Sequence, residues 1–183
     1  MRNAPLAAHA ETTAFPPLTC RTWRKIGLHF ASDFVSLSRV PEKPKPKRRS
    51  GCPVSVSLEI LGDRWSLLII RDVMVRGFRT FKDFEQSGEG IATNILADRL
   101  QKLITHGIIT TKCDPWDGRK LIYSLTPKGI DLAPVLTEMV LWAGRHEKTE
   151  NQALIRIMQK DKQKFIAEIR RRWAYETASS KSK

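Results

Sequence analysis

Three residues of this sequence have side chains whose chemistry would gain from a place at the start of a helix. Cys52 directly precedes a predicted helix over residues 54–61, where the positive end of the helix dipole would favour the reactive thiolate. Thr93 and Asn94 open a predicted helix over residues 92–106. An Asn amide can form two hydrogen bonds with an adenine edge, which discriminates against a wrong base by about 1–3 kcal/mol. The sequence therefore indicates thiol chemistry, base recognition, or both, although a small, inert and buried cysteine is an equal alternative for Cys52.

Other kinds of chemistry lack the residues that they need. The histidines are scattered and do not have the spacing of metal ligands; they are His9, His29, His106 and His146. The sequence contains no glycine-rich phosphate-binding loop, no paired acidic cluster and no G-x-S-x-G nucleophile motif. We therefore expect a protein that is not an enzyme and that uses neither a metal nor a cofactor.

The predicted helix over residues 92–106 has one apolar and one polar face. Lys102 lies on the polar face and Arg99 on its flank, where both could reach phosphates, contacts that position a protein on DNA without reading its sequence. The alternative is an ordinary amphipathic helix whose polar face is solvated. The predicted elements on either side are needed to distinguish a DNA-contacting helix from this alternative. The apolar face, which we expect to be buried, consists of Leu96, Leu100, Leu103 and Ile104.

Shorter helices are predicted ahead of this one. The helix over residues 54–61 is followed by Gly62, and Asp63 can cap the next helix, whose apolar period extends to Gly77. Thr80 is then placed to cap a third short helix.

A hairpin is predicted after the long helix. Gly107 occupies the position typical of a residue just beyond a helix end. Residues 108–113 and 120–125 have the composition and alternation of strands, and the turn-rich loop between them ends in Arg119 and Lys120. These cations could lie on phosphates or in a minor groove.

This order of elements predicts a mainly α-helical winged helix-turn-helix with a small β-hairpin as its wing. The helix over residues 92–106 is then the one that can enter a major groove, with its N-terminal turns nearest the base edges. Three more cations begin predicted helices on the same side of such a fold, although any one of them is more often simply solvated; they are Arg64, Arg79 and Lys82.

Charge is unevenly distributed along the 183 residues. The formal net charge of +13 divides into +7 for residues 1–50, zero for residues 51–150 and +6 for residues 151–183. Basic flanks favour polyanionic partners, but solvated tails are often basic without binding anything. No run of apolar residues is long enough for a membrane span, and no secretory leader follows the first residue. We therefore expect a cytoplasmic protein that does not bind membranes.

Composition predicts three segments. Residues 1–50 are expected to form a basic, disordered extension, since they lack periodicity and contain a run of alternating prolines and cations. Residues 51–148 are expected to form the winged helix-turn-helix domain. Residues 149–183 are expected to form a basic C-terminal segment with a last helix over residues 152–175.

Several stretches between Cys52 and His146 occur in an order that is typical of one family. Together they cover about half of the chain, and they resemble the HxlR-type bacterial winged-helix transcriptional regulators. The stretches are CPV (52–54), LGDRWSLLI (61–69), FRTFKDF (78–84), GIATNILADRL (90–100) and YSLTPKG (123–129), followed by Val135-Leu136 and Trp142.

The resemblance implies a homodimer that binds double-stranded DNA at a pseudo-palindromic operator. It assigns the helix that begins after Thr126 to the dimer contact, in agreement with its long apolar stripe, although such a stripe could simply close its own subunit. In some relatives a cysteine at the position of Cys52 senses oxidants or electrophiles, so an oxidant or small-molecule effector is expected. A winged-helix module that binds proteins without specific DNA recognition is the alternative function. The residues expected at the dimer contact are Leu132, Leu136, Met139 and Trp142.

Overall fold

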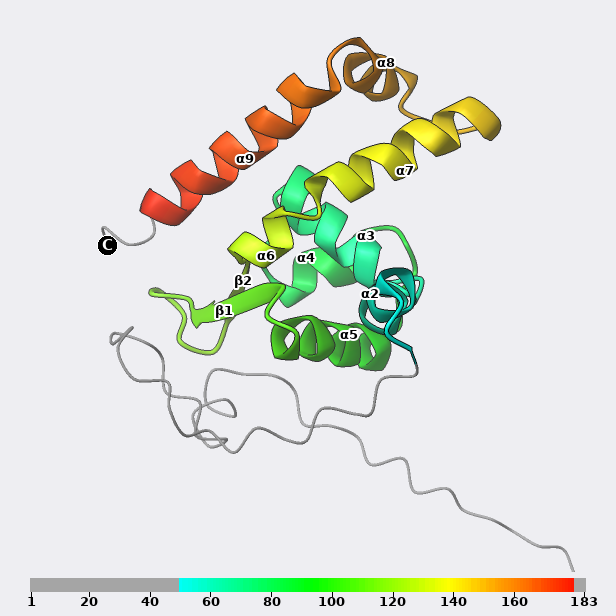
Figure 1. The fold of residues 1–183 in the computed structure, drawn as a ribbon. Helices are drawn as coiled ribbons and strands as arrows, with labels where there is room; N and C mark the ends of the chain where they lie inside the picture. The colour runs from blue at the N-terminus through cyan, green and yellow to red at the C-terminus, as the bar shows by residue number, and fades with distance from the viewer. Residues whose placement is uncertain (1–49, 180–183) are drawn as a thin grey trace, which may run out of the picture.

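The computed structural model describes residues 50–179, which fold mainly into helices around a small hairpin (Figure 1). The order of elements confirms the winged helix-turn-helix predicted from the sequence. The extension predicted over residues 1–50 lies outside the described residues except for its last one. The elements are α2 (Pro53–Leu61), α3 (Ser66–Arg71), the π-helical turn η1 (Asp72–Arg76), α4 (Phe81–Glu85), α5 (Thr93–Thr105), β1 (Ile109–Cys113), β2 (Leu121–Leu125), α6 (Pro127–Ile130), α7 (Ala133–His146), α8 (Gln152–Lys160) and α9 (Lys162–Ser179).

One hydrophobic core joins the helices to the hairpin. The aromatic rings of Phe84 and Tyr123 meet edge to face with their centroids 5.8 Å apart, which packs α4 against β2. From α5 the core receives the face that the sequence predicts, since Leu96, Leu100 and Leu103 are completely buried. Burial of these side chains fixes which face of α5 remains outside.

Local sequence signals define the ends of the helices as predicted. Thr80 accepts a hydrogen bond from the Asp83 N–H while the Asp83 carboxylate accepts from the Thr80 N–H, a reciprocal cap at the start of α4. At the end of α5, Gly107 has a φ of 65°, a conformation that glycine adopts without strain. The Ile108 N–H then reaches back to the Leu103 oxygen at 2.9 Å, which closes the helix and turns the chain into β1.

The hairpin is antiparallel, and its register runs from the pair Ile109 and Leu125 to the pair Cys113 and Leu121. The side chains at alternate positions of β2 are buried, and they are Leu121, Tyr123 and Leu125, as the alternation predicts. The free edge of β2 is also used, because the Tyr123 N–H donates to the Arg79 oxygen at 2.7 Å. The wing is thereby anchored to the segment that connects η1 with α4.

The helix predicted to continue to Gly77 instead ends in the π-helical turn η1, which corrects the expectation of a regular helix. The N–H of Gly77 bonds the Asp72 oxygen, five residues earlier. Two arginines take the carbonyl oxygens that a regular helix would use: Arg79 bonds the Val73 oxygen at 2.7 Å, and Arg172 bonds the Met74 oxygen. A π-helical turn is wider than an α-helical one, and its carbonyl oxygens can be bonded by side chains, as those of Val73 and Met74 are here.

The single helix predicted after Thr126 is also wrong, because it divides into α6 and α7. Thr126 caps α6 as expected, with its hydroxyl oxygen accepting from the Gly129 N–H at 3.1 Å. Pro134 lacks the N–H that would bond the Ile130 oxygen, so α6 ends at Ile130 and a tight turn precedes α7. This break sets the direction in which α7 leaves the wing.

The predicted last helix is likewise two helices, and its second half ends later than expected. The chain leaves helical geometry at Asp161, whose carboxylate accepts from the Lys164 N–H at 2.8 Å and so caps the start of α9. From α9, Ile166 and Ile169 enter the same core as α5 and the hairpin. Within residues 50–179, no helix is long and apolar enough to cross a membrane.

Candidate nucleic-acid interface

Helix α5 lies on the opposite side of the core from α7 and α9, next to the hairpin (Figure 1). Its leucines face the core, and Thr93 and Asn94 are exposed at its N-terminal end. Ala92 occupies the cap position and has no side-chain acceptor, so it leaves the amides of the first turn uncapped. The first turn therefore presents donors and two polar side chains to whatever lies along this face.

The carboxylate of Asp63 connects α5 to the start of α3. One oxygen accepts the N–H groups of Trp65 and Ser66, at 3.0 and 2.9 Å, and the other accepts the Ser66 hydroxyl at 2.6 Å. From α5, Lys102 donates to the same carboxylate at 3.4 Å, and Arg99 Nε lies 3.2 Å from it. Arg99 Nε is buried but does not reach hydrogen-bond geometry, so its interaction with Asp63 is purely electrostatic.

This arrangement keeps Asp63 ionised and occupies two of the predicted phosphate-binding cations. Partial burial raises the pKa of Asp63, but the hydrogen bonds from Ser66 and Trp65 and the positive charge of Arg99 outweigh burial, and the net pKa is lowered. Arg99 also pairs with Asp98 at 2.7 Å. Arg99 and Lys102 remain partly exposed on α5, so they stay within reach of a ligand on that face.

Three other cations expected on this face differ in how far they are available. The guanidinium of Arg79 is partly exposed but fully engaged within the chain: it donates to the oxygens of Val73 and Phe78, at 2.7 and 2.9 Å, and pairs with Glu176 of α9. Arg64 is exposed, with its guanidinium carbon 5.0 Å from the centre of the Trp65 ring. Lys82 is exposed on α4.

The loop between β1 and β2 carries the two predicted wing cations. Arg119 is 84% exposed, and both it and Lys120 pair with Asp117, at 3.1 and 3.5 Å. Hydrogen bonds from the side chain and backbone of Arg119 lower the pKa of Asp117 to about 2. Asp117 is therefore a carboxylate at every physiological pH, and the formal charges of the loop, with Asp114 included, sum to zero.

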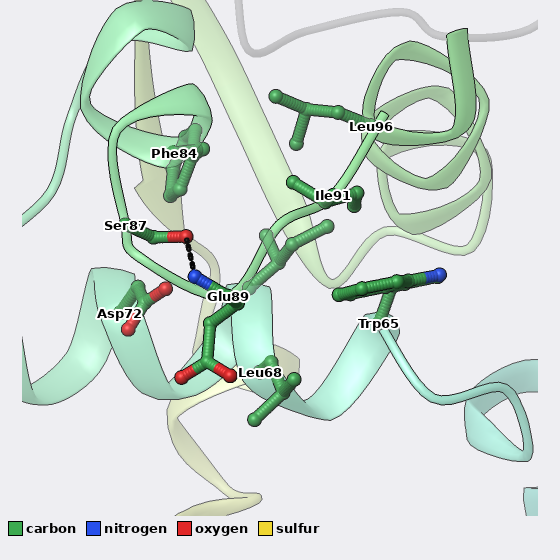
Figure 2. Close-up of a pocket in the computed structure, with 9 residues that line it drawn as sticks. Trp65, Leu68, Asp72, Phe84, Ser87, Glu89, Ile91 and Leu96 are labelled. Atoms are coloured by element: carbon green, nitrogen blue, oxygen red, sulfur yellow. Dashed lines mark hydrogen bonds between the residues drawn. The ribbon is translucent and has the colours of Figure 1, made fainter. Parts of the chain in front are cut away.

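Behind the turn between α4 and α5 lies a small hollow with room for about one water molecule (Figure 2). Asp72 is buried on its wall and pairs with Arg71 at 2.7 Å, and Arg71 in turn reaches Glu89 at 2.9 Å. Burial raises the pKa of Asp72 despite the positive charges of Arg71 and Arg76, both of which pair with it. The hollow is too small for an effector, but the ion pairs tie the turn ahead of α5 to η1.

Cys52 is exposed and occupies the cap position of α2. The backbone N–H groups of Ser55 and Val54, at the start of α2, lower the pKa of its thiol, in the direction that the sequence predicts. The alternative of a small, inert cysteine buried near the dimer contact concerns two chains, so exposure in the single chain does not decide it. Among residues 50–179 no three His, Cys, Asp or Glu side chains gather into a set that could hold a metal.

The apolar stripe of α7 divides into an inner and an outer part. Leu132 and Leu136 are partly buried and pack against the core of their own chain. Met139 and Trp142 are 47% and 56% exposed, and Val135 extends this outer face by one turn. On α2, Val54 and Leu58 are also exposed, and the helix buries none of its residues.

Sequence reasoning missed two features of this site. Asp63 was expected only to cap a helix, and its contact with Arg99 and Lys102, across 36 and 39 residues, carries no local signal. The engagement of Arg79 by Glu176 likewise spans 97 residues. Asp63 and Arg99 both lie in stretches that resemble the family, residues 61–69 and 90–100. This is the one sequence signal that could have indicated their contact.

Comparisons with known proteins agree with this geometry. Residues 60–151 match the family described as HxlR-like helix-turn-helix. The HTH-type transcriptional regulator YodB of Bacillus subtilis (strain 168) is 37% identical over 93 residues, which cover 50% of this chain and 82% of YodB. The HTH-type transcriptional regulator sll1512 of Synechocystis is 34% identical over 88 residues, which cover 48% of this chain; the chain spans 64% of that relative's length.

A solved structure shows the same arrangement. The crystal structure of PA1607 superposes with a TM-score of 0.51 at 35% identity, over 57% of this chain and 72% of PA1607. The match of half the sequence to one family, together with the coverage of most of YodB, shows that the chain belongs to the HxlR-like helix-turn-helix family.

Proposed function

We propose that this chain is a homodimeric transcription regulator that binds a pseudo-palindromic DNA operator through the α5 helices of its two protomers. Membership of a helix-turn-helix family supports DNA binding, and relatives such as YodB are named transcriptional regulators. The observation that carries the proposal is the division of α5 into a fully buried leucine face and an N-terminal end that exposes Thr93 and Asn94. In a two-fold dimer the two helices would enter successive major grooves, about 34 Å apart.

The exposed residues have distinct roles in this proposal. Thr93 and Asn94 read base edges, because side chains of the first turns of a recognition helix come closest to them. Arg99 and Lys102 exchange part of their interaction with Asp63 for operator phosphates. At the periphery, phosphates are met by the wing cations and by two exposed cations of the preceding elements; these residues are Arg119, Lys120, Arg64 and Lys82. Arg79 acts indirectly, by holding η1 and β2 in place.

The exposed apolar face of α7 supports the dimer. Val135, Met139 and Trp142 follow a spacing of four and three residues, which places them on one side of the helix. A single exposed apolar residue is ordinary, but a set along one helix face is typical of a protein interface. We propose that this face packs against the partner protomer, together with Val54 and Leu58 of α2.

Selection from a pool of random duplexes with the full chain tests the proposal without knowledge of the operator. The selected duplex should contain an inverted repeat and bind about a thousandfold or more tighter than a scrambled one, with affinity that falls steeply as salt rises. Sedimentation should find two chains per duplex. Met139→Glu should give a monomer, whereas Ile157→Glu, an equally exposed site on α8, should leave the dimer intact.

Two outcomes would contradict the proposal. Equal, weak binding to all duplexes would leave the basic flanks as nonspecific polyanion binders. No binding, or binding that hardly depends on salt, would favour the alternative of a winged helix that meets other proteins.

Oxidant sensing at Cys52 is a second candidate function, favoured by its exposed thiol and lowered pKa. In the proposed step the thiolate sulfur attacks one oxygen of hydrogen peroxide and the O–O bond breaks. The departing hydroxide takes a proton to become water, and Cys52 becomes a sulfenic acid. Peroxide should then change the affinity of the wild-type chain for its selected duplex and leave that of Cys52→Ser unchanged. An equal response of both proteins would remove Cys52 as the sensor.

A further inference from the structure

Trp116 lies in the loop between β1 and β2 and is 93% exposed, more than any other large apolar side chain of residues 50–179. The indole is the largest apolar side chain, and at this position it buries almost none of its surface. A single exposed apolar residue is ordinary, so the exposure matters only together with the order and the charges of its loop; Trp contributes more than most residues where a protein does bind a partner. Trp116 lies between β1 (Ile109–Cys113) and β2 (Leu121–Leu125), so the surface concerned is the loop of the wing.

The loop around Trp116 is fixed by its own hydrogen bonds. One oxygen of Asp114 accepts the N–H groups of Trp116 and Asp117, at 2.8 and 3.2 Å. Across the loop, the Asp114 N–H donates to the Lys120 oxygen at 2.9 Å, and the Lys120 N–H to the Asp117 oxygen at 2.8 Å. Trp116 is therefore held outward by an ordered turn, which lowers the entropic cost of using it in binding.

The charges beside Trp116 indicate the kind of partner. Arg119 and Lys120 follow it by three and four residues; both pair with Asp117, yet their side chains are 84% and 62% exposed, and the carboxylate of Asp114 accepts from backbone donors of the loop. An exposed aromatic ring with two exposed cations in the same loop suits a polyanion that also has an apolar surface, and DNA offers both through its phosphates and its sugars. The hairpin packs beside α5, so its tip extends from the same body that presents the recognition helix (Figure 1).

We propose that Trp116 is a DNA-contacting residue that packs its ring into the minor groove beside the segment read by α5, with Arg119 and Lys120 on the adjoining phosphates. The inference rests on the proposed function, because it needs a DNA on which α5 is docked. It adds an apolar contact to a wing whose only assigned residues are cations. The contact lengthens the bound segment outward from each half-site.

The test compares variants of the full chain on the selected duplex at several salt concentrations. Trp116→Ala should bind about tenfold more weakly, a loss typical of removing one aromatic contact with a nucleic acid. Its salt dependence should not change, since no charge is lost, whereas Arg119→Ala should lower the slope by about one. Trp116→Phe should retain most of the affinity. Tyr175→Ala, which removes an exposed ring from α9, should bind like the wild type.

Footprinting of the minor groove locates the contact. The wild-type chain should protect a flanking segment that Trp116→Ala leaves open, while protection under α5 stays the same. A Trp116→Ala variant that binds and protects like the wild type overturns this inference and leaves the proposed function standing. A wild-type chain that selects no duplex overturns both, and a Trp116→Ala variant that loses only its dimer would assign the ring to a protein contact instead.

Discussion

Arg99 Nε of α5 lies 3.2 Å from an oxygen of Asp63, in the loop ahead of α3. The same carboxylate caps the start of α3 and accepts from Lys102. One acidic residue therefore orients α5 and, in the proposed function, would also compete with DNA for two of its cations. Stability and DNA affinity make opposite demands on Asp63.

Asp63→Asn should separate these two demands. The amide oxygen can still accept from the Ser66 N–H, but the charge facing Arg99 and Lys102 is lost, so the free energy of unfolding should fall by about 1–2 kcal/mol. Both cations then become available to phosphates, and affinity for all duplexes should rise several-fold with a steeper salt dependence. Asp131→Asn makes the same change in net charge at an exposed site. If it raised affinity equally, net charge alone would explain the effect.

The stabilisation by Asp63 should disappear in acid. Because the pKa of Asp63 is lower in the folded chain than in the unfolded one, its ionised form favours folding at pH values above the unfolded pKa of about 4. That contribution is lost as the pH falls through the folded pKa. Asp72 acts in the opposite direction, since burial raises its pKa and protonation relieves the cost of its charge.

Urea unfolding of the wild type and Asp63→Asn between pH 7 and pH 3 measures this effect. The difference between the two free energies should be largest near neutrality and should shrink toward pH 3. A difference that stays constant across this range would mean that the charge of Asp63 does not stabilise the fold.

Elements whose ends depend on neighbouring residues could be predicted from the sequence. The reciprocal cap at Thr80, the turn at Gly107 and the alternating burial of β2 each depend on contacts within a few residues, which the residue types determine. The leucine face of α5 followed from helical spacing for the same reason.

The features that were missed depend on distant partners or on a conflict between signals. The π-helical turn η1 has its carbonyls bonded by Arg79 and by Arg172, which is about 100 residues away in the sequence. The break before α7 arises because Pro134 interrupts an apolar period that otherwise continues. Sequence periodicity cannot show that a helix pattern is divided when the apolar spacing persists across the break.

Helix α9 should contribute measurably to the stability of the wing, although it lies beyond the residues matched to the family. The Trp173 indole N–H donates to the Leu125 oxygen at 2.9 Å, at the end of β2. Trp173→Phe keeps an aromatic ring but removes this donor, and the free energy of unfolding should fall by about 1 kcal/mol or somewhat more. Hydrogen exchange of β2 amides should accelerate. Tyr175→Phe, on the exposed side of α9, should change neither quantity.

Gly129 should tolerate no side chain, because α6 passes very close to the start of the hairpin. A methyl group there would lie 2.3 Å from the Ile108 oxygen and 2.9 Å from a Leu125 methyl carbon. Gly129→Ala should therefore lower the free energy of unfolding by about 2–4 kcal/mol, as the backbone must move apart. Gly118→Ala in the wing loop meets no atom within 4 Å and should have little effect. Equal melting temperatures for the two variants would contradict the close packing at Gly129.

Asn94 and Lys102 should differ in the kind of binding that they support. Asn94→Ala removes a side chain that can distinguish bases, so affinity for the selected duplex should fall by about 1–3 kcal/mol while affinity for a scrambled duplex hardly changes. Lys102→Ala removes a charge, so affinity for both duplexes should fall alike and the salt slope should decrease by about one. Part of the Lys102 charge is already neutralised by Asp63, so this decrease should be somewhat smaller than one. Equal losses on both duplexes for Asn94→Ala would place α5 outside the major groove.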